Sequence, residues 1–508
     1  MKSVLVIHSL TRYHRQTTFE FVMCFGRYAP SNTSVHYHNV RNPFPSFHKD
    51  SEFDAMILTY DLLALRASSD WPWVLEEVMR YRHQCNKLLA FPQDDYTYNR
   101  ILDDGLNELD TQVIYTPLES GHETVYPKIS QKAEINVALT GYVDTDNLDL
   151  YLNSWMPIKD RVVDVGTRVR FLPPYFGREG QIKGRFAENF KKRAEGCSLT
   201  VDISTNDLDA FSGQDWYKFL GSVKATIGQK GGASLCDPDG SLMHSVNDFL
   251  KIHPDADFDF VEKNCFDGSV QSVGMRAISP RLFDAAMLGT AQILLEDIYL
   301  DGMLEPWVHY IPTDIDVSNL DEIIDFLSRT KALQEMVEAS AEVLLRSEKF
   351  TYKAFVEKVF ADSIDISDRQ GMIKKKSALC EFQLRATPEM FSLLYTIITT
   401  CNESEIVRET LLECIDAAIG LIETDSKLIS HLTADLFDYF VIEIPNLGPS
   451  KGFVVDFIRE CALMGSLDLL SDVIREYSLI EYDDGWKGSF DWSSYDQLEL
   501  QNYIRGDE

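Results

Sequence analysis

Residues 277–297, AISPRLFDAAMLGTAQILLED, decide the fold that we expect, because they place a short helix directly before a buried strand. Ser279 is a favoured N-cap residue, Pro280 suits the first helical position, and Gly289 suits the position after a helix. These residues predict a helix from Pro280 to Leu288. The run that follows, TAQILLED, is short and apolar, as is typical of a buried strand.

The same alternation of apolar runs and amphipathic helices extends along the chain in two series. The first series predicts strands in SVLVIHS, SVHYHNV, DAMILTY, KLLAFPQ and TQVIYTP. The second begins at EINVALTGYVD and continues through RVVDVGTRVRFL, SLTVDIS, KATIGQKGG, TAQILLED and HYIPTD. Helical stretches such as DWPWVLEEVMRYRHQCN and IKGRFAENFKKRAEG lie between them. We therefore expect an α/β fold with two parallel sheets that carry helices on both faces.

The series divide the chain into four segments. We expect one α/β domain in residues 1–134 and a second in 135–339. Amphipathic helices follow in 340–362. Residues 363–508 lack strand patterns, and we expect a separate α-helical domain there that ends in a polar, acidic tail.

Composition excludes several classes of protein. The 508 residues are 45% hydrophobic and 25% charged, an ordinary globular balance, with a net charge of −32. That charge argues against binding nucleic acid or anionic lipid, so any site for an anion needs clustered Arg or Lys. The nine cysteines are scattered without a C-x-x-C pair, as in a reduced cytoplasmic protein. We find no signal peptide and no apolar run of about 20 residues that would span a membrane.

Arg281 is the residue in the opening stretch that local rules do not favour. It falls in the first turn of the predicted helix, where the helix dipole disfavours a cation by about 0.3–1 kcal/mol. One explanation is a local pair with Asp284, worth a few tenths of a kcal/mol. The other is that Arg281 and the helix N-terminus hold a phosphate, with Asp284 accepting hydrogen bonds from a ribose.

Further candidates for ligand contacts lie in the second series. The Gly-rich turn at 228–240 contains Gly232 but lacks the glycine order of a dinucleotide-binding turn and the P-loop lysine. Asp144 and Asp146 form a D-x-D that suits either a metal or an exposed turn, and we predict no metal site. A basic cluster in GTRVRFLPPYFGREGQIKGRF suits an anion, or else a surface loop paired with acids; its cations are Arg168, Arg170, Arg178, Lys183 and Arg185.

Acidic and basic candidates for catalysis follow strands of the first series. Asp94 and Asp95 come directly after the strand in KLLAFPQ, and His8 ends the first strand. Ligands of open α/β sheets bind at the carboxyl ends of strands, which makes these side chains candidate site residues. For His8 the alternative is a loop histidine with a satisfied hydrogen bond.

Several stretches together resemble a known family: TGYVD, TRVRFLPPYFGREGQIKG, FSGQDWYKFL, GGASLCDPDG, HPDADF and, most specifically, ISPRLFDAAMLGTAQILLEDIYLDGMLEPWVHYIPTDIDVSNLDEII, with FPQDDY in the first series. They are similar to bacterial glycosyltransferases of the GT-B fold, in the group of spore-maturation-type and O-antigen or capsule cluster enzymes. The resemblance covers residues 1–362. It implies two Rossmann-like lobes facing a cleft, an acceptor side in 1–134, a nucleotide-sugar donor side in 135–339, and helices in 340–362 that cross back to the first lobe.

The resemblance also implies roles for individual residues. Arg281 would neutralise the donor diphosphate, and Asp284 would bind ribose. Arg276 stands where many retaining relatives have a glutamate that contacts the sugar, which leaves the stereochemistry open. The donor-binding candidates are Ser279, Arg281, Asp284, Arg168, Arg170, Lys183, Gly232, His309 and Tyr310, and the candidates for the catalytic base are Asp94, Asp95 and His8.

The implied activity is transfer of a hexosyl or related group from a nucleotide-sugar to a glycan or lipid-linked acceptor. We expect it to serve bacterial surface polysaccharide or glycoconjugate assembly, without a metal or further cofactor, in the cytoplasm or at the inner face of the inner membrane. The C-terminal helical domain is a candidate for binding a protein partner or for self-association. The alternatives are a nucleotide-sugar epimerase on the same fold, and a scaffold with a degenerate transferase core.

Overall fold

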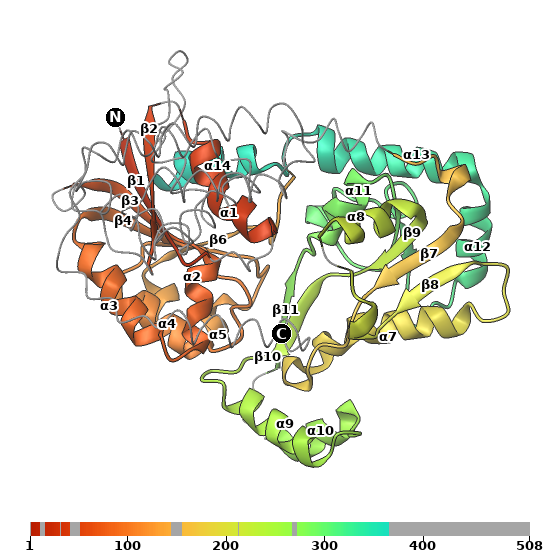
Figure 1. The fold of residues 1–508 in the computed structure, drawn as a ribbon, viewed down its shortest axis with the longest axis horizontal. Helices are drawn as coiled ribbons and strands as arrows, with labels where there is room; N and C mark the ends of the chain where they lie inside the picture. The colour runs from red at the N-terminus through yellow and green to blue at the C-terminus, as the bar shows by residue number, and fades with distance from the viewer. Residues whose placement is uncertain are drawn as a thin grey trace, which may run out of the picture. The chain divides into compact units, whose positions relative to one another are not determined.

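The computed structural model describes residues 2–10, 16–30, 32–40, 51–143, 155–211, 213–266 and 272–364. Among these residues, which Figure 1 draws in colour, 2–62 and 76–87 form one compact unit, and 63–75 and 88–364 form a second. The expected helical domain lies outside the described residues from position 365 onward, as do Asp144 and Asp146.

The first sheet has six strands in the order β2-β1-β3-β4-β5-β6. Parallel pairings join β1 to β2 and β3, β4 to β5, and β5 to β6. Consecutive residues of β1 from Val4 to Ile7 are all buried, as expected for a strand covered on both faces. The strands are β1 (Lys2–His8), β2 (Thr33–Asn39), β3 (Phe53–Leu58), β4 (Cys85–Ala90), β5 (Val113–Thr116) and β6 (Glu134–Val137).

Helices connect and cover these strands. The α-helices are α1 (Gln16–Arg27), α2 (Tyr60–Ala64), α3 (Trp71–Arg82), α4 (Asn99–Glu108) and α5 (His122–Val125), and the 3-10 turns are η2 (Leu65–Ala67) and η3 (Ile129–Gln131). Helix α14 (Tyr352–Ile364) is distant in sequence but also meets this part of the fold. The Phe355 ring lies 5.9 Å from the Phe91 ring, and the Ser363 hydroxyl is 2.7 Å from the Tyr115 hydroxyl.

The second sheet has five strands in the order β13-β12-β9-β7-β8, and its pairings are all parallel. In chain order the second strand lies on one side of the first and the remaining strands lie on the other, which is a doubly wound arrangement. The strands are β7 (Val163–Arg168), β8 (Val201–Ser204), β9 (Val223–Gly228), β12 (Ala291–Leu295) and β13 (Ile311–Thr313).

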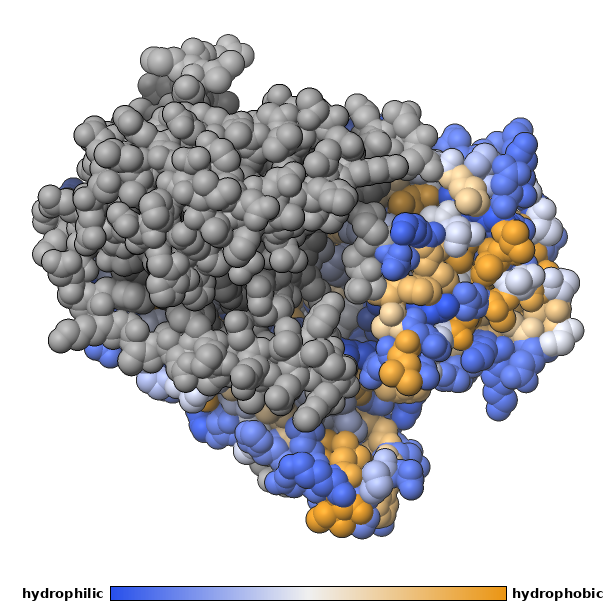
Figure 2. Space-filling view, viewed as in Figure 1, coloured by the Kyte–Doolittle hydropathy of each residue, from blue (hydrophilic) through white to orange (hydrophobic). Residues whose placement is uncertain are grey.

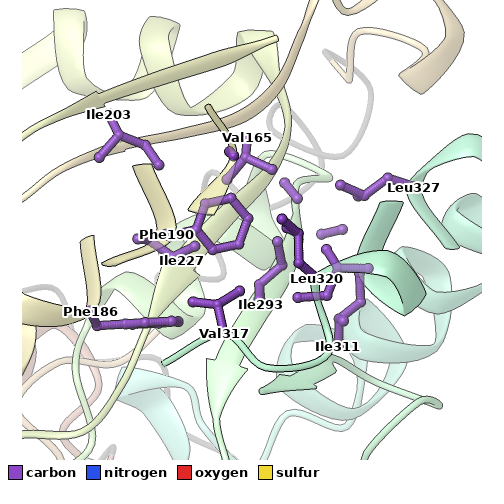
Figure 3. Close-up of a cluster of buried hydrophobic side chains, with 14 of the residues drawn as sticks. Val165, Phe186, Phe190, Ile203, Ile227, Ile293, Ile311, Val317, Leu320 and Leu327 are labelled. Atoms are coloured by element: carbon purple, nitrogen blue, oxygen red, sulfur yellow. The ribbon is translucent and has the colours of Figure 1, made fainter. Parts of the chain in front are cut away.

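Both faces of the second sheet carry a hydrophobic core. Ile293 and Leu294 are adjacent in β12 but belong to different buried clusters, because neighbouring strand residues point to opposite faces. Figure 3 shows the first cluster, in which Ile293 packs with Phe186 and Phe190 of α7. The helices are α7 (Gly177–Arg193), α8 (Gly213–Ser222), α11 (Arg281–Met287), α12 (Leu320–Ser328) and α13 (Thr330–Ala341), with the 3-10 turns η5 (Ile158–Asp160), η6 (Pro174–Phe176), η7 (Asp207–Asp209) and η8 (Leu300–Gly302) and the π-helical turn η9 (Glu342–Arg346).

A hairpin and two helices are inserted between β9 and α11. Strands β10 (Gly231–Leu235) and β11 (Ser272–Ala277) pair antiparallel, and between them lie α9 (Ser241–Ile252) and α10 (Phe258–Cys265). Figure 2 shows apolar surface over these two helices, where Ile252 is 74% exposed and Phe260 is 46% exposed. The sequence pattern did not predict this hairpin.

The expected fold class, an α/β protein with two Rossmann-like parallel sheets, is confirmed for the described residues. One strand differs in its assignment: Glu134–Val137, which we placed at the start of the second series, pairs with β5 in the first sheet. A four-residue strand at a sheet edge carries no signal in its own sequence for which sheet it joins. The domain boundaries themselves stay predictions.

Candidate functional site

A pocket lies at the carboxyl edge of the second sheet, beside the ends of β7 and β9. In doubly wound sheets, ligands bind outside the carboxyl ends of the strands, at the point where the strand order reverses. Here that point lies between β7 and β9. The pocket contains about 570 Å³ of space, part of it open to solvent. Its lining includes Val169, Lys183, Trp216, Thr226, Gly228, Gln229, Gly231, Ser279, Arg281, Gln292, Leu294 and Tyr299.

The pocket differs in charge from the rest of the protein. Two cations, Arg281 and Lys183, are among the described residues that line it, and none of those residues is acidic. The whole chain has a net charge of −32, so its general field repels anions. A local pair of cations in such a chain favours an anionic ligand at this position.

Arg281 is the first residue of α11, and two neighbours hold its guanidinium. Its Nη1 donates a hydrogen bond of 2.7 Å to the backbone carbonyl of Arg168. Its Cζ lies 4.8 Å from the ring centre of Trp216, a cation–π contact. The orientation of Arg281 therefore depends on residues that are distant in the sequence, and Trp216 was not among the site residues that we expected.

Asp284 lies one turn further along α11 and meets the same tryptophan. The Trp216 indole N–H donates a hydrogen bond of 3.2 Å to the Asp284 carboxylate. Burial raises the pKa of Asp284 to about 6, and the indole hydrogen bond and the charge of Arg281 oppose this rise. Arg281 thus attracts Asp284 while it also lines the pocket, so the two explanations of Arg281 are compatible. The described pocket lining does not include Asp284.

Ser279 lines the pocket, but it is not the N-cap residue of α11 that we expected. Pro280 occupies the N-cap position of α11 with helical angles of φ −56° and ψ −27°, and α11 has no side-chain cap hydrogen bond. Ser279 instead supplies its backbone carbonyl, which accepts a hydrogen bond of 3.1 Å from the Leu282 N–H. The rigid ring of Pro280 begins the turn, so the serine side chain is not required for capping.

Gly232 lies in β10, opposite Arg276 of β11. Its φ is 153°, and a Cβ atom at this position would lie 1.9 Å from the carbonyl oxygen of Met275. Glycine is therefore required here by the close approach of the two strands. Its neighbour Gly231 lines the pocket.

The predicted basic cluster is dispersed in the structure. Lys183 lines the pocket from α7. Arg168 instead forms an ion pair of 2.9 Å with Asp202, and its guanidinium lies 4.3 Å from the Phe219 ring centre. The remaining members lie elsewhere: Arg170 is exposed after β7, Arg178 pairs with Glu262 of α10, and Arg185 lies 5.7 Å from the Phe258 ring centre.

His309 and Tyr310 lie just before β13, outside the described pocket lining. Tyr310 is buried, its ring centre is 5.5 Å from that of the pocket residue Tyr299, and its hydroxyl donates to the carbonyl of Asp297 at 3.4 Å. His309 Nδ1 accepts a hydrogen bond of 2.9 Å from the Glu305 N–H. Tyr310 thus supports a wall of the pocket through Tyr299.

Asp94 and Asp95 follow β4 but have different surroundings. Asp94 is exposed, with a left-handed φ of 48°, and its carboxylate accepts a hydrogen bond of 2.8 Å from the Tyr96 hydroxyl. Asp95 is fully buried, accepts hydrogen bonds from the hydroxyls of Thr116 and Tyr126, and has its pKa raised by burial. Of the two, Asp94 presents its carboxylate to solvent.

His8 ends β1, beside the point where the strand order of the first sheet reverses between β1 and β3. It is buried, and its Nδ1 accepts a hydrogen bond of 3.2 Å from the Leu10 N–H. The next residue, Ser9, donates its backbone N–H to the buried carboxylate of Asp61 at 2.6 Å. The catalytic roles of His8, Asp94 and Asp95 stay predictions.

Arg276, which stands where the resemblance leads one to expect a glutamate, belongs to a network of ion pairs. It contacts Glu179 of α7 at 2.8 Å and Asp297, after β12, at 3.2 Å. Lys230, whose side chain is 7% exposed, pairs with Glu119 at 2.7 Å and with Asp297 at 3.4 Å. Arg276 and Lys230 thus share carboxylates from three other segments, and Asp297 pairs with both cations. Sequence spacing gave no signal for this network.

Three further findings concern the described residues alone. The five cysteines among them form no disulfide. Within the same residues, no group of three or more His, Cys, Asp or Glu side chains is arranged to hold a metal ion. In this part of the chain, no helix combines the length and apolar character needed to cross a membrane.

The fold of this chain is similar to those of several solved structures. No protein-family model matches the chain, and no curated protein matches it in sequence. Anabaena HepE in complex with UDP is similar over 72% of this chain and 100% of its own, at 10% identity and a TM-score of 0.38. Sucrose-phosphate synthase from Thermosynechococcus elongatus is similar over 71% of this chain and 98% of its own, at 10% identity and a TM-score of 0.37. A glycosyltransferase from Rickettsia africae is similar over 71% of this chain and 97% of its own, at 9% identity and a TM-score of 0.36.

Proposed function

We propose that this protein transfers a sugar from a nucleoside-diphosphate sugar to a hydroxyl group of a glycan or lipid-linked acceptor. The observation that carries the proposal is the pocket between the ends of β7 and β9, in which Arg281 and Lys183 provide positive charge in a strongly acidic chain. Doubly wound sheets bind nucleotides at this position. The cations suit the diphosphate of such a ligand.

The residues suit the charge changes of glycosyl transfer. An acceptor hydroxyl forms a bond to the anomeric carbon, the bond from that carbon to the diphosphate oxygen breaks, and the electron pair leaves with the diphosphate. Arg281 and Lys183 would stabilise the charge that develops on this leaving group. Because they are cations themselves, we propose that the reaction proceeds without a bound metal.

The acceptor proton needs a base. The candidates are Asp94, Asp95 and His8, and we favour Asp94 because its carboxylate is exposed at the end of β4 whereas Asp95 and His8 are buried. Replacing Asp94 by Asn should lower kcat and leave the Kd for the nucleoside diphosphate unchanged. An unchanged kcat would remove Asp94 from the mechanism.

The wider role is proposed on the resemblance of residues 1–362. We propose a hexosyl or related transferase in bacterial surface polysaccharide or glycoconjugate assembly, located in the cytoplasm or at the inner face of the inner membrane. Residues 363–508 are proposed to mediate a protein contact. Light scattering of the full chain tests self-association directly, and a monomer at all concentrations would leave a different protein as the partner.

Two experiments test the proposal. Titration calorimetry with UDP, GDP, ADP, dTDP and CDP should show binding of at least one of them, and binding of none would refute it. Product analysis with the matching nucleotide-sugar then identifies the reaction. Release of nucleoside diphosphate that depends on added acceptor supports transfer, whereas an isomerised nucleotide-sugar formed without acceptor would identify an epimerase. Binding without turnover of any donor would support a scaffold.

A further inference from the structure

Trp216 lies at the contact between α8 and α11, on the wall of the pocket. It packs with the buried cluster of Leu220, Ala285 and Leu288, which joins the two helices. Its side chain is partly exposed and lines the pocket. Trp216 is therefore anchored by apolar packing while part of it remains accessible from the pocket.

Trp216 contacts two functional candidates through different parts of its ring. The guanidinium of Arg281 lies over the ring, 4.8 Å from its centre. The indole N–H, at the ring edge, donates a hydrogen bond of 3.2 Å to the Asp284 carboxylate. A change at Trp216 thus affects a pocket cation and the adjacent, partly buried acid together.

These contacts favour one orientation of a long, flexible side chain. A guanidinium stacked on an aromatic ring keeps its charge while it loses freedom of rotation. The Arg168 carbonyl accepts a hydrogen bond from the Nη1 of the same guanidinium at 2.7 Å. A ligand that meets Arg281 in this orientation does not have to order it, which strengthens binding.

We propose that Trp216 is a positioning residue of the donor site: its ring holds Arg281 toward the diphosphate, and its N–H orients the Asp284 carboxylate on the adjacent turn. This inference rests on the proposed function for its ligand. The hydrogen bond from the Trp216 indole to the Asp284 carboxylate forms without a ligand, so it can be tested by an experiment of its own.

Few charged groups act on Asp284, so its titration can report on the hydrogen bond from the Trp216 indole. Arg281 is the charge that acts on its carboxyl, and burial raises its pKa to about 6. The charged side chains on the elements that pack against α11 have partners of their own. Lys218 pairs with Asp215 in α8, Lys224 of β9 with Asp164 of β7, Lys331 with Glu335 in α13, and Arg346 with Glu342 in η9. Glu338 of α13 accepts a hydrogen bond from the neutral side chain of Gln334.

The first test measures binding of the nucleoside diphosphate that gives the highest affinity in the calorimetric panel. Trp216→Leu removes the ring and should weaken binding about tenfold, and Trp216→Phe should weaken it about two- to threefold. In an Arg281→Ala background, each substitution should change affinity less than it does in the wild type, because the part of its effect that passes through Arg281 is already lost. Trp307→Leu, which alters a tryptophan outside the pocket lining, is the matched control and should bind as the wild type does.

The results separate the possibilities. Independent effects of Trp216 and Arg281 that add in the double variant would overturn the proposal, as would wild-type affinity in Trp216→Leu. If Trp216→Leu melts below the assay temperature, the same comparison is made with Trp216→Phe, which keeps an aromatic ring against the α8–α11 cluster. Failure of every nucleoside diphosphate to bind the wild-type protein would instead refute the proposed function.

The second test needs no ligand. In the full chain with ¹⁵N-labelled tryptophan, the indole N–H resonance that disappears in Trp216→Phe belongs to Trp216. Its chemical shift should change with pH with a midpoint near 6, and this change should be absent in Asp284→Asn. A purely structural tryptophan would show no such titration, and a pH-independent resonance would overturn the link to Asp284.

Discussion

Replacing Arg281 by Ala is the perturbation that bears most directly on the donor pocket. The guanidinium lines the pocket and is held by the Arg168 carbonyl and the Trp216 ring. Loss of one hydrogen bond to a charged group costs about 1.5–3 kcal/mol. We therefore expect the Kd for a nucleoside diphosphate to rise about 10- to 100-fold.

The assay is titration calorimetry with the full chain at constant pH and salt, because ionic contacts weaken as salt increases. Arg178→Ala is the matched control, since Arg178 is an exposed arginine that pairs with Glu262 outside the pocket lining. Arg281→Lys keeps the charge but loses the planar donor geometry, so its affinity for the nucleoside diphosphate should fall between that of the wild type and that of Arg281→Ala. Melting temperatures of all variants show whether the fold is retained.

Wild-type affinity in Arg281→Ala, in a folded protein, would refute the assignment of Arg281 to the diphosphate. The pair with Asp284 and the stack on Trp216 would then account for the residue. An equal loss of affinity in Arg178→Ala would indicate a general effect of surface charge. Either result would remove the main support for the proposed pocket.

Three further predictions concern stability, each measured by urea unfolding. The pKa of Asp284 is raised to about 6, which means that ionisation of this carboxyl opposes folding. As pH rises from about 4 to 7, the free energy of unfolding of the wild type should therefore fall by up to about 3 kcal/mol relative to that of Asp284→Asn. Parallel pH profiles of the two proteins would contradict this. Gly232→Ala should destabilise by about 1–3 kcal/mol because its Cβ meets the opposite strand, whereas Gly231→Ala has open space and should cost less than about 1 kcal/mol; equal losses would contradict the strand contact. Arg161 is buried, and among its hydrogen bonds is one of 2.9 Å to the Leu288 carbonyl. Arg161→Met leaves these buried acceptors without their donor, so it should lower the free energy of unfolding by about 3 kcal/mol or more. An unchanged free energy of unfolding would show that the acceptors find other donors.

Much of the fold follows from local patterns in the sequence. The strand in residues 291–295 and the helix before it were predicted because apolar runs and turn residues act over a few positions. The hairpin of β10 and β11 was missed because its strands are joined through two helices and one contains adjacent glycines, which weaken a strand pattern. The membership of Glu134–Val137 in the first sheet depends on pairing with β5, which lies outside that stretch.

The site was predictable where one segment supplies the contacts and not where several do. Arg281 stood out because a first-turn cation conflicts with the helix dipole, and the structure places it at the pocket. Trp216 was missed because it lies 65 positions earlier than Arg281 and packs against it only in three dimensions. The basic cluster looked dense in sequence, but Arg168 and Arg178 pair with acids from distant segments.

A crystal structure of the protein with the best-binding member of the calorimetric panel would show whether the pocket beside β7 and β9 holds a nucleoside diphosphate. We expect diphosphate density outside the carboxyl ends of β7 and β9, within hydrogen-bond distance of Arg281 and Lys183. Density for the nucleotide at any other position on the chain would contradict this expectation.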